Sequence, residues 1–203
     1  MKNKCLFRLM VALFMVFAIR VQVLAGEPTE RIKETTDKII AVLTDPALSA
    51  ADRAAERRRI VREAVDERFD WETISRMALA RHWRKRTDEE KREFIQLFGK
   101  LLERTYMNKV ENYSGEKVYY IDEIIDRDDK HYGVVKVKIV TDRDEELSVD
   151  YRVKNNGDDW FVYDVSIESV SLVNNYRVQF NHILMKSSYQ ELVKRLKEKV
   201  AQE

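Results

Sequence analysis

The chain of 203 residues has little of three residues that usually constrain a fold: it contains one cysteine, two prolines and five glycines. The single cysteine, Cys5, can form no internal disulfide, so stability must come from a hydrophobic core, which a chain of this length can supply. The scarcity of proline and glycine indicates long regular elements with few breaks. The sequence has no repeat, low-complexity tract or linker, and we therefore expect one domain over residues 26–203.

Motifs that are typical of enzymes and metal sites are also missing. The sequence has no GxSxG, P-loop or GxGxxG pattern, and its three histidines, His82, His131 and His182, do not have the spacing of metal ligands. The acidic segments 126–130 and 142–146 lack the glycine and the glutamate that a calcium loop requires at fixed offsets, so we expect solvated hairpin turns there. These absences favour a protein that is not an enzyme and needs no metal or cofactor. A buried acid–base pair, which needs no motif, stays open as an alternative.

The first 25 residues have the pattern of a secretory signal peptide. Three basic residues among the first eight precede an uncharged apolar run of 11 residues at 9–19, and Val-Leu-Ala at 23–25 supplies small residues for cleavage. An apolar run of this length is too short to cross a bilayer, which takes roughly 20 residues. We predict a cleaved signal peptide at residues 1–25 and a mature chain that begins at Gly26; an uncleaved membrane anchor is the alternative.

The rest of the chain is slightly acidic. Residues 1–25 carry four of the 37 basic residues and none of the 36 acidic ones, which leaves 33 basic residues against 36 acidic residues and a net charge of about −3. A protein that binds nucleic acid normally has a basic excess or a basic stripe. We therefore expect no nucleic-acid partner.

Helical patterns occupy the first half of the mature chain. Pro28 opens an amphipathic stretch that ends at Asp45-Pro46, and Ser49 and Asp70 are the expected N-caps of a second and a third helix. Thr87 and Glu90 form a capping-box pattern, in which each side chain accepts a hydrogen bond from an amide of the first turn. The helix that follows has apolar residues at i, i+3 and i+4 spacing and is the strongest helical pattern in the sequence.

Strand patterns follow Gly115. Four β-rich runs are separated by short turns rich in Asp, Asn and Gly, which predicts an antiparallel meander. Within the runs apolar and polar residues alternate, as expected when only one face of a sheet is covered. Two further helices end the chain, the last one capped by Ser188. The sequence thus predicts an α+β fold, with several helices packed on one face of an antiparallel sheet of at least four strands. The expected strands are residues 118–125, 132–141, 147–154 and 160–167.

The stretch from Trp160 to Phe180 carries an unusual amount of apolar surface. Strict alternation predicts that Phe161, Tyr163, Val165 and Ile167 share one face of a strand, with Asp164, Ser166 and Glu168 on the opposite face. The spacing then changes to a helical stripe made of Leu172, Val173, Tyr176 and Phe180. The pattern alone leaves open whether this surface is ordinary core or the wall of a pocket.

Two stretches of the sequence match one protein family. The first runs from Arg-His-Trp-Arg at 81–84 through the helix with Phe94 and Phe98 to Tyr-Ser-Gly-Glu at 113–116. The second contains Val-Asp-Tyr-Arg at 149–152, Val-Tyr-Asp-Val at 162–165, Val-Ser-Leu-Val at 170–173 and Asn-Tyr-Arg at 175–177. In this order they resemble the MlaC-like auxiliary components of ABC transporters, also called toluene-tolerance proteins, over roughly residues 60–186. The sequence departs from the family pattern at Ala80 and Ser169, where glycine is expected, and at Asp88, where proline is common.

The resemblance implies a soluble periplasmic carrier that shuttles phospholipid between the outer and inner membranes and maintains the lipid asymmetry of the outer membrane. Family members hold acyl chains in an apolar cavity between helices and a curved NTF2-like sheet. They exchange lipid with an outer-membrane lipoprotein complex and with an inner-membrane ABC transporter that bears an MCE-domain protein. On this basis phospholipid is the cargo, and the residues expected to line its cavity are Trp83, Phe94, Phe98, Leu101, Tyr106, Val137, Ile139, Val149, Tyr151, Phe161, Tyr163, Val165, Leu172, Val173, Tyr176 and Phe180.

Two other functions fit the same scaffold. An enzyme that acts on a hydrophobic small molecule would need a carboxylate or a histidine pointing into the cavity. An extracytoplasmic chaperone would carry no stoichiometric phospholipid. Arg81, Arg84 and Arg177 are candidates for contacts with a phosphate or with a partner, and solvated surface is the alternative for each.

Overall fold

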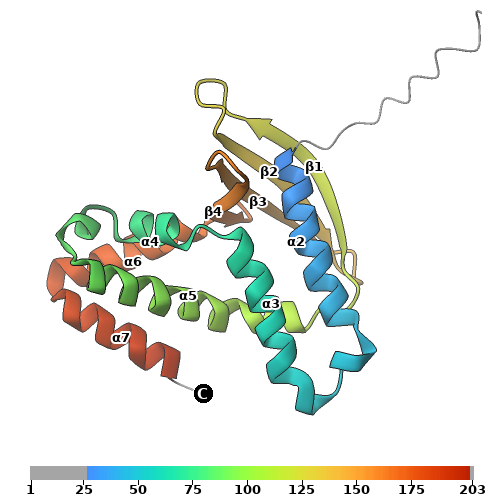
Figure 1. Ribbon diagram of the computed structural model, residues 1–203, viewed down its shortest axis with the longest axis horizontal. Helices are drawn as coiled ribbons and strands as arrows, with labels where there is room; N and C mark the ends of the chain where they lie inside the picture. The colour runs from blue at the N-terminus through green and yellow to red at the C-terminus, as the bar shows by residue number, and fades with distance from the viewer. Residues whose placement is uncertain (1–26, 202–203) are drawn as a thin grey trace, which may run out of the picture.

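The sheet follows the expected meander. The computed structural model describes residues 27–201, and its five strands lie in sequence order, each antiparallel to its neighbour (Figure 1). The four expected strands are confirmed to within one residue at each end, and a strand of two residues extends the sheet. The strands are β1 (Lys117–Ile125), β2 (Tyr132–Val140), β3 (Glu146–Asn155), β4 (Trp160–Ile167) and β5 (Val170–Ser171).

Helices occupy most of the remaining described chain. The expected helices are all present, and three short 3-10 helices are added between them. The α-helices are α2 (Glu27–Thr44), α3 (Ala54–Arg68), α4 (Trp71–Leu79), α5 (Asp88–Glu111), α6 (Leu172–Lys186) and α7 (Tyr189–Ala201), and the 3-10 helices are η1 (Pro46–Leu48), η2 (Ala51–Arg53) and η3 (Ala80–Lys85).

Most of the expected helix caps are confirmed. The Thr87 amide donates to the Glu90 carboxylate at 3.0 Å, and the Glu90 amide donates to the Thr87 hydroxyl at 3.2 Å, which closes the capping box. Asp70 caps α4. The expectation for Ser49 is wrong: Ser49 is the C-cap of η1, η2 separates it from α3, and its hydroxyl donates to the carbonyl of Pro46 instead.

The helices cover the sheet unevenly. Helix α2 lies across one face of the sheet, α4 to α7 form a helical layer beside it, and α3 stands between the two (Figure 1). Each part has its own apolar cluster of buried residues. Phe69, at the junction of α3 and α4, packs against both clusters and forms a bridge with Val162 of β4. This residue therefore joins the helical layer to the sheet.

Strand β4 does not alternate as its sequence predicts. Val165 lies opposite Tyr151 and Val162 lies opposite Val153, so Tyr163 is an extra residue at an irregularity of the ladder. An extra residue of this kind reverses the faces of the strand beyond it. The expectation that Phe161, Tyr163, Val165 and Ile167 share one face is therefore wrong, because only Val165 and Ile167 lie on the same face as Tyr151 and Val149.

The bulge also changes the surroundings of the polar residues of β4. Asp164 and Ser166, which alternation placed on a solvated face, are only 4% and 5% exposed. Asp164 accepts hydrogen bonds from the Ser171 hydroxyl at 2.6 Å and from the Val173 amide at 3.1 Å. The carboxylate thus holds the first turn of α6 against the sheet.

The expected signal peptide, residues 1–25, lies outside the described residues. Within residues 27–201, none of the helices is long and apolar enough to cross a membrane.

Candidate functional site

The first group of expected site residues lies in the core of the helical layer. Helix α5 contributes Phe94 and Phe98 to this core, and α6 contributes Tyr176 and Phe180. The ring centroid of Phe98 lies 5.0 Å from the ring centroid of Tyr176, 5.3 Å from that of Phe180 and 5.7 Å from that of Phe94. Such spacing is typical of close-packed aromatic side chains. The buried members of the expected site in this cluster are Trp83, Phe94, Phe98, Leu101, Val173, Tyr176 and Phe180, and Leu172 packs against it.

A second group lies on the inner face of the sheet, which we define as the face that contacts Ile32 of α2. Val137 and Val149 are buried there, opposite one another on β2 and β3. Ile139, Tyr151 and Val165 pack against the same cluster but are only partly buried. The structure thus divides the expected site between two apolar clusters.

Helix α2 is fixed over part of this inner face. The Thr29 amide and hydroxyl donate to the Glu123 carboxylate of β1, at 2.9 and 2.6 Å, and Ile32 is buried against the sheet. The hydroxyl end of Tyr151 is also covered, and burial raises the pKa of Tyr151 to about 12. Five apolar positions on the inner face of β2, β3 and β4 remain half-buried: Ile139, Leu147, Tyr151, Val165 and Ile167.

Half-buried apolar side chains also lie on the helices beside this surface. Helix α6 follows β5 directly and contacts β4, so Leu172 lies close to the end of the sheet that carries Ile167. On α5, Leu102 and Tyr106 are half-buried, and burial and the nearby Tyr176 raise the pKa of Tyr106. We take as the candidate site the half-buried apolar side chains on the inner face of β3 and β4, together with Leu172 at the start of α6.

Two hollows of the described chain lie largely away from the candidate site. One, of about 400 Å³, lies between α5 and α7 over Tyr189 and Val193. The other, of about 370 Å³, lies on the sheet among Lys136, Lys138 and Asp150.

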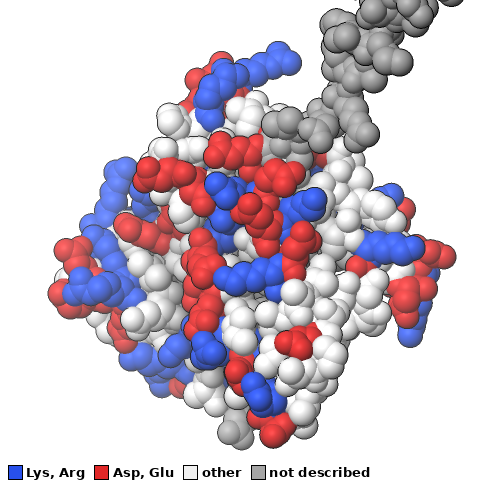
Figure 2. Space-filling view, turned by 45° about the vertical axis from the view of Figure 1, so that its right-hand side comes forward, with Lys and Arg blue, Asp and Glu red and all other residues white. Residues whose placement is uncertain are grey.

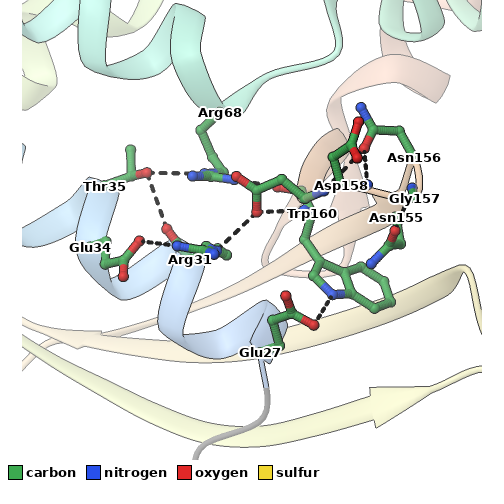
Figure 3. A network of polar contacts seen from close by, with 11 residues as sticks. Glu27, Arg31, Glu34, Thr35, Arg68, Asn155, Asn156, Gly157, Asp158 and Trp160 are labelled. Atoms are coloured by element: carbon green, nitrogen blue, oxygen red, sulfur yellow. Dashed lines mark hydrogen bonds and ion pairs between the residues drawn. The ribbon is translucent and has the colours of Figure 1, made fainter.

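A polar network that the sequence did not predict holds α2 and α3 to the turn before β4 (Figure 3). Asp159 binds Arg31 of α2 at 2.9 Å and Arg68 of α3 at 3.1 Å. Arg68 also donates to the Thr35 hydroxyl at 3.2 Å, and the Trp160 indole donates to Glu27 at 3.4 Å. Burial raises the pKa of Asp159, but the Trp160 amide and the two arginines outweigh it and leave that pKa below 3.8. These residues are far apart in the sequence and have no local signature.

Three expected site residues lie outside both clusters. Phe161 packs under the guanidinium group of Arg68, 5.8 Å from its ring centroid, and Tyr163 packs edge-on against Tyr132 at 5.8 Å. Tyr106 is half-buried on α5. The bulge in β4 explains the positions of Phe161 and Tyr163, because it separates them from Val165.

Side chains that could bind a metal ion do not cluster in the part of the chain that the structure describes. Within residues 27–201, three or more His, Cys, Asp or Glu side chains do not come together as metal ligands would. His82 lies 3.2 Å from the Asn181 side chain at the surface of the helical layer, whereas His131 and His182 are exposed.

Comparison with known proteins gives consistent matches. The family model described as MlaC protein matches residues 33–198. The intermembrane phospholipid transport system binding protein MlaC of Haemophilus influenzae is 24% identical over 148 residues, which cover 71% of this chain and 69% of that protein. The structure of a phospholipid-binding protein from Ralstonia solanacearum in complex with a phospholipid superimposes with a TM-score of 0.76 and 26% identity, covering 87% of this chain and 98% of that chain.

Proposed function

Because this chain belongs to the MlaC family, whose model matches residues 33–198, we propose that it binds a phospholipid with the acyl chains between the inner face of its sheet and its helical layer. The observation that carries the proposal is the set of half-buried apolar positions on β2, β3 and β4, which α2 leaves partly uncovered. The relative of similar fold from Ralstonia solanacearum was solved with a phospholipid, which supports the same cargo here.

The energetics favour a carrier. Removing a methylene from water contributes about 0.8 kcal/mol, so two acyl chains with about 15 methylenes each gain roughly 24 kcal/mol. A bilayer offers the same gain. A site of apolar side chains therefore makes transfer to and from a membrane nearly neutral, and the direction is set by the partners.

The wider role follows from the family. The relative in Haemophilus influenzae is named as part of an intermembrane phospholipid transport system. We place this chain in the periplasm, after removal of residues 1–25, as a carrier between an outer-membrane lipoprotein complex and an inner-membrane ABC transporter with an MCE-domain protein. In this role the protein performs no catalysis, and phospholipid is its cargo.

The test combines native mass spectrometry of the purified protein with a pair of matched variants. Val165→Glu places a carboxylate on the inner face of the sheet, and Val134→Glu places one on the outer face, since Val134 lies opposite Arg152. Both valines are half-buried. We expect Val165→Glu to lose its phospholipid but keep a cooperative thermal transition, and Val134→Glu to keep both.

Leu101→Glu is the contrasting variant. Leu101 is 6% exposed in the close-packed helical cluster, and an unpaired carboxylate buried there costs several kcal/mol. We expect this variant to unfold. If Val165→Glu keeps stoichiometric phospholipid, the site is elsewhere in the chain. If the wild-type protein carries no phospholipid after export to the periplasm, the proposed function is wrong.

A further inference from the structure

Two tracts of the sequence contain no acidic residue. Residues 73–87 and 169–190 lack Asp and Glu, although the chain has 36 of them, and at that average density the two tracts would carry about seven. They carry seven basic residues instead: Arg76, Arg81, Arg84, Lys85, Arg86, Arg177 and Lys186. A net positive charge of this size contrasts with the slightly acidic chain as a whole.

The fold brings the two tracts together. Ala78 and Trp83 of the first tract pack in one cluster with Val173 and Phe180 of the second. On the outside, Arg81 donates to the Asn181 side chain at 3.1 Å. Helix α4, η3 and α6 therefore present a common surface, which we call the α6–η3 surface and define by Arg81, Arg84, Lys85, Arg177, Val178, Asn181 and Met185.

The basic side chains of this surface are not neutralised by the described chain. Arg81, Arg84, Lys85 and Arg177 are exposed. None of the four forms an ion pair with a carboxylate within residues 27–201. Elsewhere basic and acidic side chains are mixed, as on the face shown in Figure 2. The α6–η3 surface is therefore positively charged and complements the charge of an anionic partner.

Large apolar side chains project from the same surface. Val178 and Met185 are 61% and 69% exposed and lie two turns apart on α6. The Asn181 side chain, midway between them, contacts the sulfur of Met185 at 3.5 Å. Exposed apolar residues flanked by arginine and lysine are typical of helices that lie in a membrane interface, where apolar tips enter the acyl boundary and cations meet lipid phosphates.

We propose that the α6–η3 surface docks on the surface of an anionic phospholipid bilayer. An acidic protein would match the charge, but it would not account for apolar side chains that stand free among the cations. Docking would hold the molecule against a membrane while its site exchanges lipid with that membrane or a protein in it. The surface is distinct from the apolar site, so docking does not depend on bound cargo.

The test is flotation of the full mature protein with vesicles of phosphatidylglycerol and phosphatidylcholine, compared with vesicles of phosphatidylcholine alone. We expect binding only to the anionic vesicles and a loss of binding as salt is raised. One basic residue near an anionic membrane changes affinity about fivefold, so Arg81→Glu/Arg177→Glu should weaken binding at least 25-fold.

Two further variants control this measurement. Arg127→Glu/Lys130→Glu makes the same change in net charge in the exposed turn between β1 and β2, and it should bind within about threefold of wild type. Arg84→Glu/Lys85→Glu should weaken binding like the first variant, without removing the hydrogen bond between Arg81 and Asn181. Thermal melting checks that every variant is folded.

The proposal is overturned if the wild-type protein does not bind anionic vesicles at low salt, or if the variants in the turn and on the α6–η3 surface lose binding equally. The first result would leave an acidic protein as the partner of this surface. Neither result bears on the proposed function, because phospholipid content is measured separately by extraction from the same preparations.

Discussion

Ala80→Gly is expected to stabilise the protein. Ala80 ends α4 with φ +47° and ψ −123°, a backbone conformation that side chains with a Cβ rarely adopt and that glycine adopts readily. A residue held there costs of order 1–3 kcal/mol. Ala80 is exposed, so its methyl group contributes little packing that the substitution would remove. The family pattern, in which glycine is expected at this position, agrees with this geometry.

The net effect is smaller than the strain. Glycine makes the unfolded chain more flexible, which lowers stability by about 0.4–1 kcal/mol. The difference leaves a gain of about 1 kcal/mol, and in a domain of this size that raises the melting temperature by roughly 2–4 °C. Urea unfolding and thermal melting, both followed by circular dichroism, measure the gain directly.

Ala78→Gly is the matched control for this prediction. Ala78 lies inside the same helix and is 1% exposed, so glycine there should destabilise the protein by about 1 kcal/mol or more. If Ala80→Gly is no more stable than wild type, the backbone strain at Ala80 is not a measurable cost, and the reasoning is refuted.

Three other predictions concern the core, a helix cap and acid stability. Phe98→Ala should lower the free energy of unfolding by about 3–5 kcal/mol in urea titrations, because the ring is 0% exposed and the cavity would be enclosed by other aromatic rings; a loss below 1 kcal/mol would show that the cluster is loosely packed. Asp164→Ala should cost about 1–3 kcal/mol, since it leaves the Val173 amide unpaired, and hydrogen exchange should rise first at the start of α6; unchanged exchange there would contradict the capping role. The folded-state pKa of Asp159 is lowered, so its contribution is present above the unfolded pKa near 3.8 and is lost as the pH falls through the folded value. Asp159→Asn should therefore be less stable at pH 7 and lose less stability than wild type between pH 5 and pH 2, and parallel pH profiles for the two proteins would rule out this contribution.

Local patterns in the sequence were sufficient for the α-helices and the four long strands. The capping box at Thr87 and the cap at Asp70 mark helix starts because a side chain and an amide three residues away meet without help from the rest of the fold. The four strands were found because alternation and turn residues are also local signals. The order of these elements predicted the α+β fold class, which the comparisons bear out.

Positions within the expected site required information that local patterns do not contain. Alternation in β4 predicted one apolar face, but the register against β3 inserts Tyr163 as an extra residue and divides that face. Apolar periodicity marked both Phe98 and Val165 as site residues, but Phe98 is enclosed by other rings and Val165 is half-buried on the sheet. What surrounds each side chain depends on segments far away in the sequence, so periodicity cannot distinguish core from lining.

Long-range contacts also determine the polar and charged features. Asp159 meets Arg31 and Arg68 only because α2, α3 and the turn before β4 converge. The two acid-free tracts can be read from the sequence, but they form one surface only because α4, η3 and α6 pack together, with Arg81 and Asn181 in contact across 100 residues of chain. Hydrogen-bond geometry and hydrophobic spacing act over a few residues and are encoded locally, whereas register, burial and the joining of distant surfaces arise when the whole chain has packed.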